Sequence, residues 1–550
     1  MGSSPEQSVL LNDFLQPMSI DVEKCHVLSH ALMQNFMHLA ADSLDQFLPT
    51  PISESILRPV ADYGRGSGGT NLRVGFVELS ASDDDNDLKP NGTNHFRDCH
   101  GETKTHVTAT DDEADDDRES HCVSTSPSSR LHRHLERSWP IANHLKNDNA
   151  DSLFLWIGKC IAEVVAEGCQ KLGLARDSPI PLGVTFSFPM EQPSLERATI
   201  TSMGKGFAMP PNVDLGICLI DAYDRHRRGS THNLPPVYAA AIANDSVSTL
   251  VSFIFHYDGM ARRRAAMGLI LGTGSNATIP VKLSMLHPSK RPRKVNVLAG
   301  EKVEDAKIAV NTEWSINGTA PPMRELGLIT AWDDELSAQN ERPGFQPLEY
   351  MTAGRYLGEL GRIMLLDYLI RTCKVSRACL PRKLLQQDSL TTTFLSHFKP
   401  LDTKSLLWTL RLEFPEPVNS GFAWTEHDAE ALYRIAKAIE VRAAGIIAAA
   451  ILALLTVGGE LPAEEDASIA RSGDCEGCDV CELGVGYTGG CVVHFQDYLE
   501  DCQDFINQLV ARRFGTKSRW SVVMRPCHDG GITGAAILSA AALSSQRSQT

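Results

Sequence analysis

Apolar positions along the chain follow two different spacings. Helical spacing characterises residues 1–58, 150–172 and most of the stretch from 349 to 455. Short continuous apolar runs, which are typical of buried strands, alternate with these helical stretches. The clearest runs are 180–190, 237–243 and 263–271. This alternation of strands and helices predicts α/β domains.

One segment departs from both spacings. Between about Ser80 and Ser129 the sequence contains DDDND, DDEADDD and STSPSS. Blocks of like charge and small polar residues cannot bury enough apolar surface to become ordered. We therefore predict a disordered acidic insertion at 80–130 inside a domain.

The longest apolar stretch, AAGIIAAAILALLTVGG at 443–459, is rich in alanine and glycine. It is short for a membrane span, so it predicts a buried core helix.

Size and charge narrow the classes of function. The chain has 550 residues, which is more than one hydrophobic core usually serves. Its net charge of −16 argues against nucleic acid or an anionic membrane as a partner. The N-terminal sequence MGSSPEQSVLLNDFLQ lacks the basic stretch and apolar run that are typical of a signal peptide. Without a secretion signal, the fourteen cysteines are expected to be reduced thiols. We expect a cytoplasmic protein.

Four apolar segments adjoin turns rich in Gly, Thr, Asn or Asp. Glycine lets the backbone approach a ligand closely, and such turns present N–H groups and hydroxyls to an anion. One such turn is weak evidence, but four in one α/β chain indicate nucleotide phosphates. The turns are GGTN at 68–71, ANDS at 243–246, GTGSN at 272–276 and YTGG at 487–490.

The ordered set of motifs resembles the hexokinase family of sugar kinases. The stretches that carry this resemblance are GGTNLRV (68–74), FSFP (186–189), GKGF (204–207), NDSVST (244–249), GTGSN (272–276), NTEW (311–314) and PLEYMTAGRYLGE (347–359). Within the family, the sugar loop SMGKGF is similar to that of fungal N-acetylglucosamine kinases. It carries Gly204 where glucose-phosphorylating members usually carry threonine. The missing side chain would leave room for a 2-acetamido group.

The resemblance implies an α/β chain with the two-lobed actin-like ATPase (ribonuclease H-like) fold, in which a sugar binds in a cleft between a small and a large domain. The lobes expected from the motifs are an N-terminal helical segment of the large lobe at 1–58, a small lobe at 59–244, a large lobe at 245–530, and a C-terminal helix that returns to the small lobe at 531–550.

The resemblance also assigns roles to residues. Asp245 would be the catalytic base that takes the proton of the sugar 6-hydroxyl. The implied sugar ligands are Ser187, Gly204, Lys205, Asn244, Asn276, Glu313 and Glu349. The implied ATP and phosphate ligands are Gly68, Gly69, Thr70, Asn71, Arg73, Gly272, Thr273, Gly274, Gly489, Gly490, Asp529 and Gly530. The cofactors would be ATP and Mg²⁺, the partner a small-molecule sugar, and the protein a monomer.

Each of these residues also has a purely structural interpretation. An Asn-Asp pair after a strand is most often a turn or a helix N-cap. Lys205 alone would be a solvated lysine, and Glu313 alone a strand carboxylate. The motif CEGCDVC, with Cys475, Cys478 and Cys481, is an incomplete match to a zinc site, so we expect reduced loop thiols there.

The first phosphate motif is incomplete. Family members usually carry a buried strand that ends in Asp, then one apolar residue, then Gly-Gly-Thr-Asn. In this chain the Asp position is Gly66 and the apolar position is Ser67, and DYG precedes Arg65. Two explanations stay open: a chain shortened at this point, or a genuine variant with weak catalysis that serves sugar sensing or regulation. A glucose or fructose kinase is a third alternative.

Overall fold

The computed structural model describes residues 5–58, 72–79, 105–109, 131–141, 145, 150–201, 212–229, 233–258, 262–463, 482–516 and 518–547. These residues divide into two compact units. The first unit comprises residues 1–46, 269–276 and 313–524, and the second comprises 47–268, 277–312 and 525–550.

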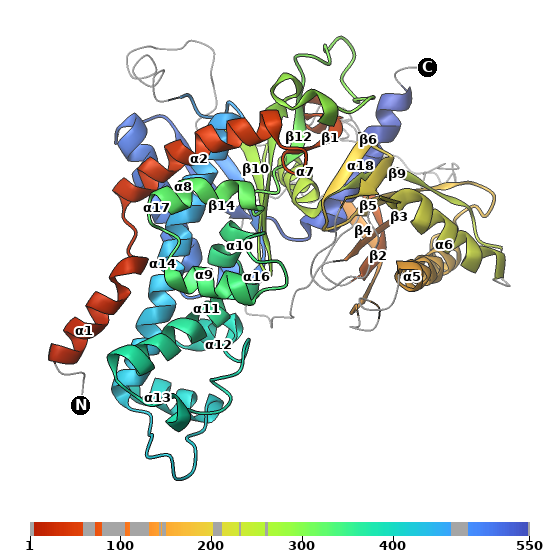
Figure 1. Cartoon of the computed structure of the whole chain (residues 1–550). Helices are drawn as coiled ribbons and strands as arrows, with labels where there is room; N and C mark the ends of the chain where they lie inside the picture. The colour runs from red at the N-terminus through yellow and green to blue at the C-terminus, as the bar shows by residue number, and fades with distance from the viewer. Residues whose placement is uncertain are drawn as a thin grey trace, which may run out of the picture. The chain divides into compact units, whose positions relative to one another are not determined.

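The first unit is mainly helical (Figure 1). Its helices are α1 (Pro5–Leu15), α2 (Val22–Asp42), α8 (Ala320–Glu325), α9 (Ala331–Gln339), α10 (Pro347–Thr352), α11 (Gly354–Asp367), α12 (Thr392–His397), α13 (Thr403–Glu413), α14 (Glu426–Val457), α16 (Gly490–His494) and α17 (Tyr498–Phe514). Its strands are β13 (Glu482–Thr488) and most of β14 (Ser521–Pro526).

The long helix α14 forms the centre of this unit, with α2 and α17 packed beside it (Figure 1). A capping box at Thr425 and Asp428 starts the helix, because each side chain accepts a backbone N–H of the other residue. By length and hydropathy, α14 could cross a membrane, but 89% of its most apolar window is buried inside the protein. The predicted buried helix at 443–459 is therefore confirmed in its helical part, where residues from Ala443 to Leu455 are buried.

The second unit holds most of the strands. Its strands are β1 (Leu48–Ser53), β2 (Leu72–Leu79), β3 (Thr105–Ala109), β4 (Leu131–Trp139), β5 (Ile180–Thr185), β6 (Met190–Ser194), β7 (Arg197–Ile200), β8 (Val213–Asp214), β9 (Val237–Ala243) and β12 (Lys307–Asn311). Its helices are α3 (Glu54–Leu57), α5 (Ala150–Lys171), α6 (Leu215–Gly229), α7 (Asp245–Tyr257) and α18 (Gly530–Arg547). Two strands, β10 (Arg263–Leu271) and β11 (Ser275–Lys282), have residues in both units.

The strands form three sheets. The six-stranded sheet has the order β1-β12-β11-β10-β13-β14, the five-stranded sheet has the order β4-β2-β3-β5-β9, and β6-β7-β8 form a small third sheet. In the five-stranded sheet, β2 runs antiparallel to β4 and β3, whereas β3, β5 and β9 are parallel. Thr185 of β5 pairs with Ala243 of β9, so these two strands end at the same edge of the sheet.

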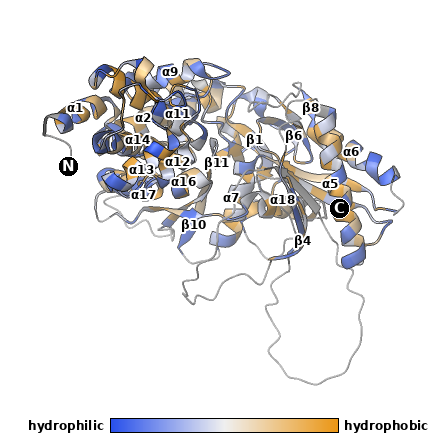
Figure 2. Ribbon diagram, turned by 90° about the horizontal axis from the view of Figure 1, so that it is seen from below, coloured by the Kyte–Doolittle hydropathy of each residue, from blue (hydrophilic) through white to orange (hydrophobic). Residues whose placement is uncertain are grey.

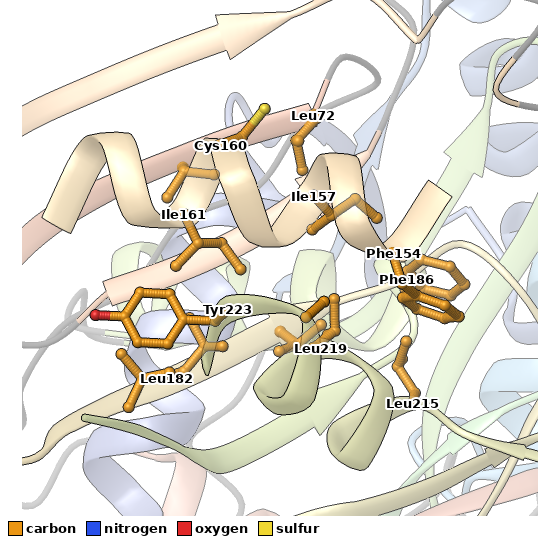
Figure 3. Close-up of a cluster of buried hydrophobic side chains, with 14 of the residues drawn as sticks. Leu72, Phe154, Ile157, Cys160, Ile161, Leu182, Phe186, Leu215, Leu219 and Tyr223 are labelled. Atoms are coloured by element: carbon orange, nitrogen blue, oxygen red, sulfur yellow. The ribbon is translucent and has the colours of Figure 1, made fainter. Parts of the chain in front are cut away.

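Helices α5 and α6 pack on one another and build the core of this unit with the sheet (Figure 3). The side chains of Ile157 and Ile161 on α5 and Leu219 and Tyr223 on α6 are buried together with Leu182 of β5. Both apolar and hydrophilic positions are visible on α6 (Figure 2), as expected for a helix with one buried face. The amphipathic helix predicted at 150–172 is confirmed by α5, which buries Ile157 and Ile161 in this core and leaves Lys159 exposed.

Two strands lie where the sequence analysis expected none. Residues 105–109, inside the predicted disordered insertion, form β3 between β2 and β5, so the prediction of disorder is wrong for these residues. The rest of the insertion lies outside the described residues. Residues 48–53 were assigned to a helical segment but form β1 at the edge of its sheet. Proline is tolerated on edge strands, which explains how Pro49 and Pro51 fit there.

The unit boundaries also differ from the lobes predicted from the motifs. Residues 47–58, 245–268 and 277–312 lie in the second unit, because β1 pairs with β12 and α7 packs on α18 and β12. Residues 525–550, which include α18, lie in the same unit.

A buried carboxyl group in α14 predicts a pH-dependent stability. Glu440 is fully buried, and burial raises its pKa to about 8 although the Lys437 ammonium group opposes this shift. In the unfolded chain the Glu440 carboxyl group has its ordinary pKa of 4.5. Between pH 4.5 and about 8 the folded protein therefore holds a proton that the unfolded chain has lost. The free energy of unfolding falls as pH rises through this window. Above pH 8 the effect is complete.

Glu440→Gln should remove this dependence. Relative to the wild type, the variant should gain more than about 1 kcal/mol of unfolding free energy between pH 5 and pH 8. The groups that face Glu440 are Lys437, Asp501, Cys491, Cys502 and Tyr498, all unchanged in the variant. Urea denaturation of both proteins at the two pH values measures the effect, and parallel pH profiles would contradict the assignment.

Candidate active site

The candidate base lies at the start of α7. Asn244 is the N-cap of this helix: its Oδ1 accepts from Ser246 N at 2.9 Å and from Ser246 Oγ at 2.7 Å. Asp245 is the first helical residue, and its Oδ1 accepts from Ser246 N at 2.8 Å. Asp245 is partly exposed, and negative side chains are favoured at this end of a helix. Asn244 thus has the helix N-cap role that its sequence context suggested.

The first turn of α7 is fixed by buried hydroxyls. Ser246 Oγ lies 2.7 Å from Thr278 Oγ1, and Ser248 Oγ lies 2.7 Å from Thr185 Oγ1. Thr185 Oγ1 also donates to the backbone oxygen of Gly531 at 3.0 Å. The first turn of α7, which carries Asp245, is therefore bonded through hydroxyl groups to β11 and β5.

Ser187 follows β5 by two residues, as Asp245 follows β9 by two residues. Because Thr185 and Ala243 pair at the ends of these parallel strands, both side chains belong to the same edge of the five-stranded sheet. Ligands of α/β proteins bind preferentially outside the carboxyl ends of parallel strands. The structure thus brings these two candidate residues to one edge of the second unit.

A second group of candidate residues lies in the first unit. Glu349, in the first turn of α10, is buried, and its Oε2 accepts from the backbone N–H of Ser275 at 2.9 Å. Ser275 Oγ accepts from Trp314 Nε1 at 3.0 Å, and Ser275 O accepts from the hydroxyl of Ser315. Burial and the Glu349 carboxylate both raise the pKa of Tyr356. Ser275, which the sequence analysis did not select, is the residue that orients Glu349.

Glu313 is held in an unusual backbone conformation. Its φ is +44°, in the left-handed region that residues other than glycine rarely adopt. Gln46 Nε2 donates to its backbone oxygen at 3.0 Å, and Asn276 Nδ2 donates to its Oε1 at 3.3 Å. Such strain persists only where the surroundings enforce it, and it is concentrated at functional sites. The structure therefore brings Asn276 and Glu313 together.

The turn at 272–274 is the best-defined phosphate candidate. Gly272 N donates to Gly274 O at 3.0 Å, and Gly354 N donates to Gly272 O at 2.8 Å. A Cβ on Gly272 would lie 3.2 Å from the Cα of Gly489, and a Cβ on Gly489, whose φ is +125°, would lie 2.4 Å from the backbone of Leu271. The two glycine turns are thus in direct contact, in a space that side chains would fill. The backbone oxygen of Thr273 accepts from the backbone N–H of Arg355. Gly490 is the first residue of α16.

Two predicted phosphate ligands are paired with each other. Arg73 Nη1 donates to Asp529 Oδ1 at 2.6 Å, and Arg133 Nη1 lies 2.8 Å from Asp529 Oδ2. Burial opposes ionisation of Asp529, but the nearby Arg133 and Arg73 guanidinium groups keep its pKa below the ordinary value. Asp529 precedes Gly530, the first residue of α18. Arg133 was missed by the sequence analysis, because no local motif marks it.

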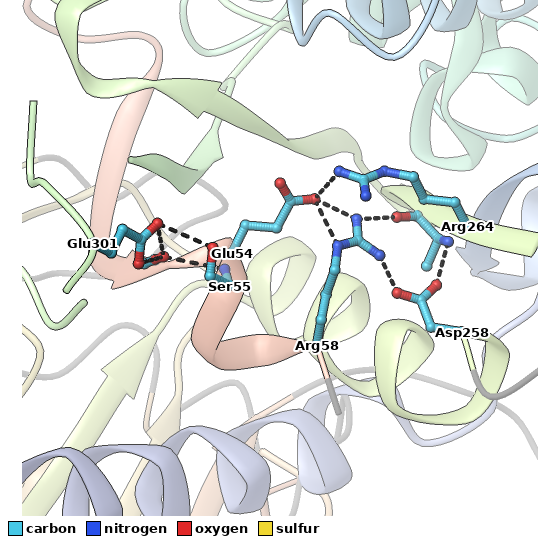
Figure 4. A network of polar contacts seen from close by, with 8 residues as sticks. Glu54, Ser55, Arg58, Asp258, Arg264 and Glu301 are labelled. Atoms are coloured by element: carbon cyan, nitrogen blue, oxygen red, sulfur yellow. Dashed lines mark hydrogen bonds and ion pairs between the residues drawn. The ribbon is translucent and has the colours of Figure 1, made fainter. Parts of the chain in front are cut away.

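A polar network lies at the last described residue before the GGTN motif (Figure 4). Arg58 donates to the carboxylates of Glu54 and Asp258 and, at 3.0 Å, to Ala265 O. Arg264 Nη2 donates to the same Glu54 oxygen at 3.0 Å. The network ties the end of α3 to the end of α7 and to β10.

Several candidate residues lie outside the described residues. These are Gly66, Ser67, Gly68, Gly69, Thr70, Asn71, Gly204, Lys205, Cys475, Cys478 and Cys481.

Glycine at positions 272, 274, 489 and 490 leaves the backbone of these two turns without side chains, as a phosphate site built from backbone N–H groups requires. Mg²⁺ is usually held by one or two carboxylates together with substrate phosphates rather than by an all-protein cage. Among the described residues there is no cluster of three or more His, Cys, Asp or Glu side chains that could hold a metal ion.

The chain is similar to known hexokinases along most of its length. Two family models described as hexokinase match residues 10–255 and 266–541. Hexokinase-7 of Oryza sativa is 24% identical over 75% of this chain and 79% of its own length. Hexokinase of Schistosoma mansoni is 30% identical over 48% of this chain and 51% of its own length. A solved structure of a Schistosoma mansoni hexokinase complexed with glucose covers 98% of this chain and 100% of its own, with a TM-score of 0.66 at 20% identity.

The chain belongs to the hexokinase family of sugar kinases, since the family models span most of it. The structural likeness confirms the predicted actin-like ATPase fold. Membership of the family implies ATP and Mg²⁺ as phosphoryl donor and cofactor.

Proposed function

We propose that this chain transfers the γ-phosphoryl group of Mg-ATP to the 6-hydroxyl of N-acetylglucosamine. The kinase assignment is carried by polar side chains within the family motifs. Asn244 and Asp245 lie at the start of α7. Glu349 and Glu313 are held by hydrogen bonds from Ser275 and Asn276. The choice of sugar is supported by Gly204 in the sequence SMGKGF. We also propose that the protein is cytoplasmic and monomeric.

In the proposed mechanism Asp245 accepts the proton of the sugar 6-hydroxyl as phosphoryl transfer proceeds. Glu313, Glu349 and Asn276 accept from and donate to the other hydroxyls, because a buried polar group without a partner costs about 1–3 kcal/mol. In the 272–274 turn the backbone N–H groups of Thr273 and Gly274 would donate to phosphate oxygens, since that of Gly272 already donates to Gly274 O. Mg²⁺, if bound together with the nucleotide, would supply positive charge that neutralises the phosphates.

Glucose is the second candidate substrate. It is favoured by the glucose complex of the Schistosoma mansoni hexokinase, which has the same fold. A third candidate is a hexokinase-like sugar sensor with weak or absent catalysis, favoured by Gly66 and Ser67 at positions where the family carries Asp and an apolar residue.

The choice between the two sugars is tested by comparing kcat/KM for N-acetylglucosamine and glucose with the purified chain. A preference for N-acetylglucosamine is expected. Gly204→Thr should shift the ratio toward glucose by about tenfold or more, since one small group in a pocket is worth about 1–3 kcal/mol. A wild-type preference for glucose that Gly204→Thr leaves unchanged would exclude N-acetylglucosamine as the substrate.

A further inference from the structure

A buried tyrosine links two parts of the first unit that carry candidate site residues. The side chain of Tyr498 is buried, and its hydroxyl donates to the backbone oxygen of Thr352 at 3.0 Å. Thr352 is the last residue of α10, the short helix that carries Glu349. The bond therefore joins α17 to the helix of the candidate sugar carboxylate.

A residue that follows the glycine turn at 489–490, a candidate phosphate segment, also contacts the backbone oxygen of Thr352. Cys491, the second residue of α16, has its Sγ 4.0 Å from Thr352 O. A Cβ on Gly354 would lie 3.0 Å from Gly272 O and 3.2 Å from the Cβ of Cys491. Gly354, two residues after the end of α10, is thus in close contact with the 272–274 turn and the start of α16, and Thr352 O is contacted by both Cys491 and Tyr498.

Helix α17 is anchored independently of this bond. Lys437 Nζ on α14 lies 2.8 Å from Asp497 Oδ2 and 2.7 Å from Asp501 Oδ2. Asp497 is the residue before Tyr498. Gln496, which has a φ of +53°, accepts from Lys399 Nζ at 2.6 Å through its backbone oxygen and donates through Nε2 to Leu395 O at 2.8 Å. The backbone around Tyr498 is therefore a fixed support.

Tyr223 offers a comparison with a purely structural tyrosine. It is fully buried in the second unit, and its hydroxyl donates to Pro235 O at 2.6 Å. Pro235 lies at the opposite end of β9 from Asn244. Both tyrosines therefore make one bond to a backbone oxygen inside a core, but only the bond of Tyr498 joins segments that carry candidate ligands.

We propose that Tyr498 is a positioning residue that couples nucleotide binding to sugar binding. Its hydroxyl fixes the helix of Glu349 relative to α16 and the glycine turn at 489–490, so that a ligand ordering one side also orders the other. The inference rests on the proposed function for the assignment of these two sides. Binding at one site then changes affinity at the other by a reciprocal factor.

The test compares Tyr498→Phe with Tyr223→Phe as the matched control. Isothermal titration gives the affinity of each protein for Mg-ADP, with and without saturating N-acetylglucosamine, and again with glucose. In the wild type, sugar should tighten Mg-ADP binding. Tyr498→Phe should reduce this coupling factor at least threefold, whereas Tyr223→Phe should keep it, although both variants lose some thermal stability. Asp497→Asn weakens the ion pair of α17 with Lys437 and should reduce the coupling factor to a smaller extent. This variant tests the inference if Tyr498→Phe does not fold.

The outcomes separate the inference from the proposed function. Equal coupling factors in Tyr498→Phe and Tyr223→Phe, with Asp497→Asn also unchanged, would overturn the inference, as would a wild type that shows no coupling or no Mg-ADP binding. Turnover of sugar by the wild type is measured separately. Coupling without turnover would contradict the proposed function while leaving the role of Tyr498 intact.

Discussion

Asp245→Asn should lower kcat for sugar phosphorylation by about 10²–10⁴-fold, which is the range expected when a general base is removed. The asparagine oxygen can still accept from Ser246 N, so the helix start should stay intact. The KM for sugar should change much less than kcat, because the side chain acts on the proton that leaves in the transition state. A coupled assay for sugar 6-phosphate measures both constants.

Asp21→Asn is the matched control for this variant. Asp21 is the N-cap of α2, and its side chain accepts from Lys24 N at 2.8 Å, so the same substitution is made at another helix start. Its activity should equal that of the wild type. If Asp245→Asn retained full turnover, Asp245 would not be the base.

Gly534→Ala should destabilise the second unit by about 3 kcal/mol or more, the upper range for overpacking a core. An added Cβ would lie 1.9 Å from Ser248 O and 2.6 Å from Ser248 Cα, so α18 and α7 would have to separate. Because α7 begins at Asp245, activity should fall at temperatures where the fold persists. Denaturant unfolding and activity of the same preparation measure the two effects.

Gly229→Ala provides the contrast, since a Cβ at this exposed end of α6 meets no atom within 4 Å. It should leave stability unchanged within about 0.5 kcal/mol. A Gly534→Ala protein as stable as Gly229→Ala would show that the two helices do not pack as described.

Local sequence patterns predicted those helices and strands whose apolar spacing lies within a single stretch of the chain. The strands at 237–243 and 263–271 were predicted because each apolar run ends at a turn rich in polar residues or glycine. The helix N-cap that an Asn-Asp pair commonly forms after a strand is the structure found at Asn244. The prolines of β1 hid an edge strand, and the acidic surroundings of β3 hid a segment whose pairing partners, β2 and β5, lie elsewhere in the sequence.

The contacts that complete the candidate site are mostly non-local. Arg73 and Asp529 are 456 positions apart, so neither sequence context reveals the pair. Glu313, which has a left-handed conformation, accepts through its backbone oxygen from Gln46, which is 267 positions away. Ser275 orients Glu349 through a backbone N–H, a role that residue type does not encode.

The central claim is that this chain is a sugar kinase, and its most direct test is sugar-dependent formation of ADP from Mg-ATP. We predict that the purified chain forms ADP and sugar 6-phosphate in equal amounts with N-acetylglucosamine or glucose. The rate should rise when an apolar strand that ends in Asp at position 66, followed by an apolar residue at position 67, replaces the residues before Gly68. The account would be contradicted if neither protein forms sugar phosphate at saturating Mg-ATP and sugar.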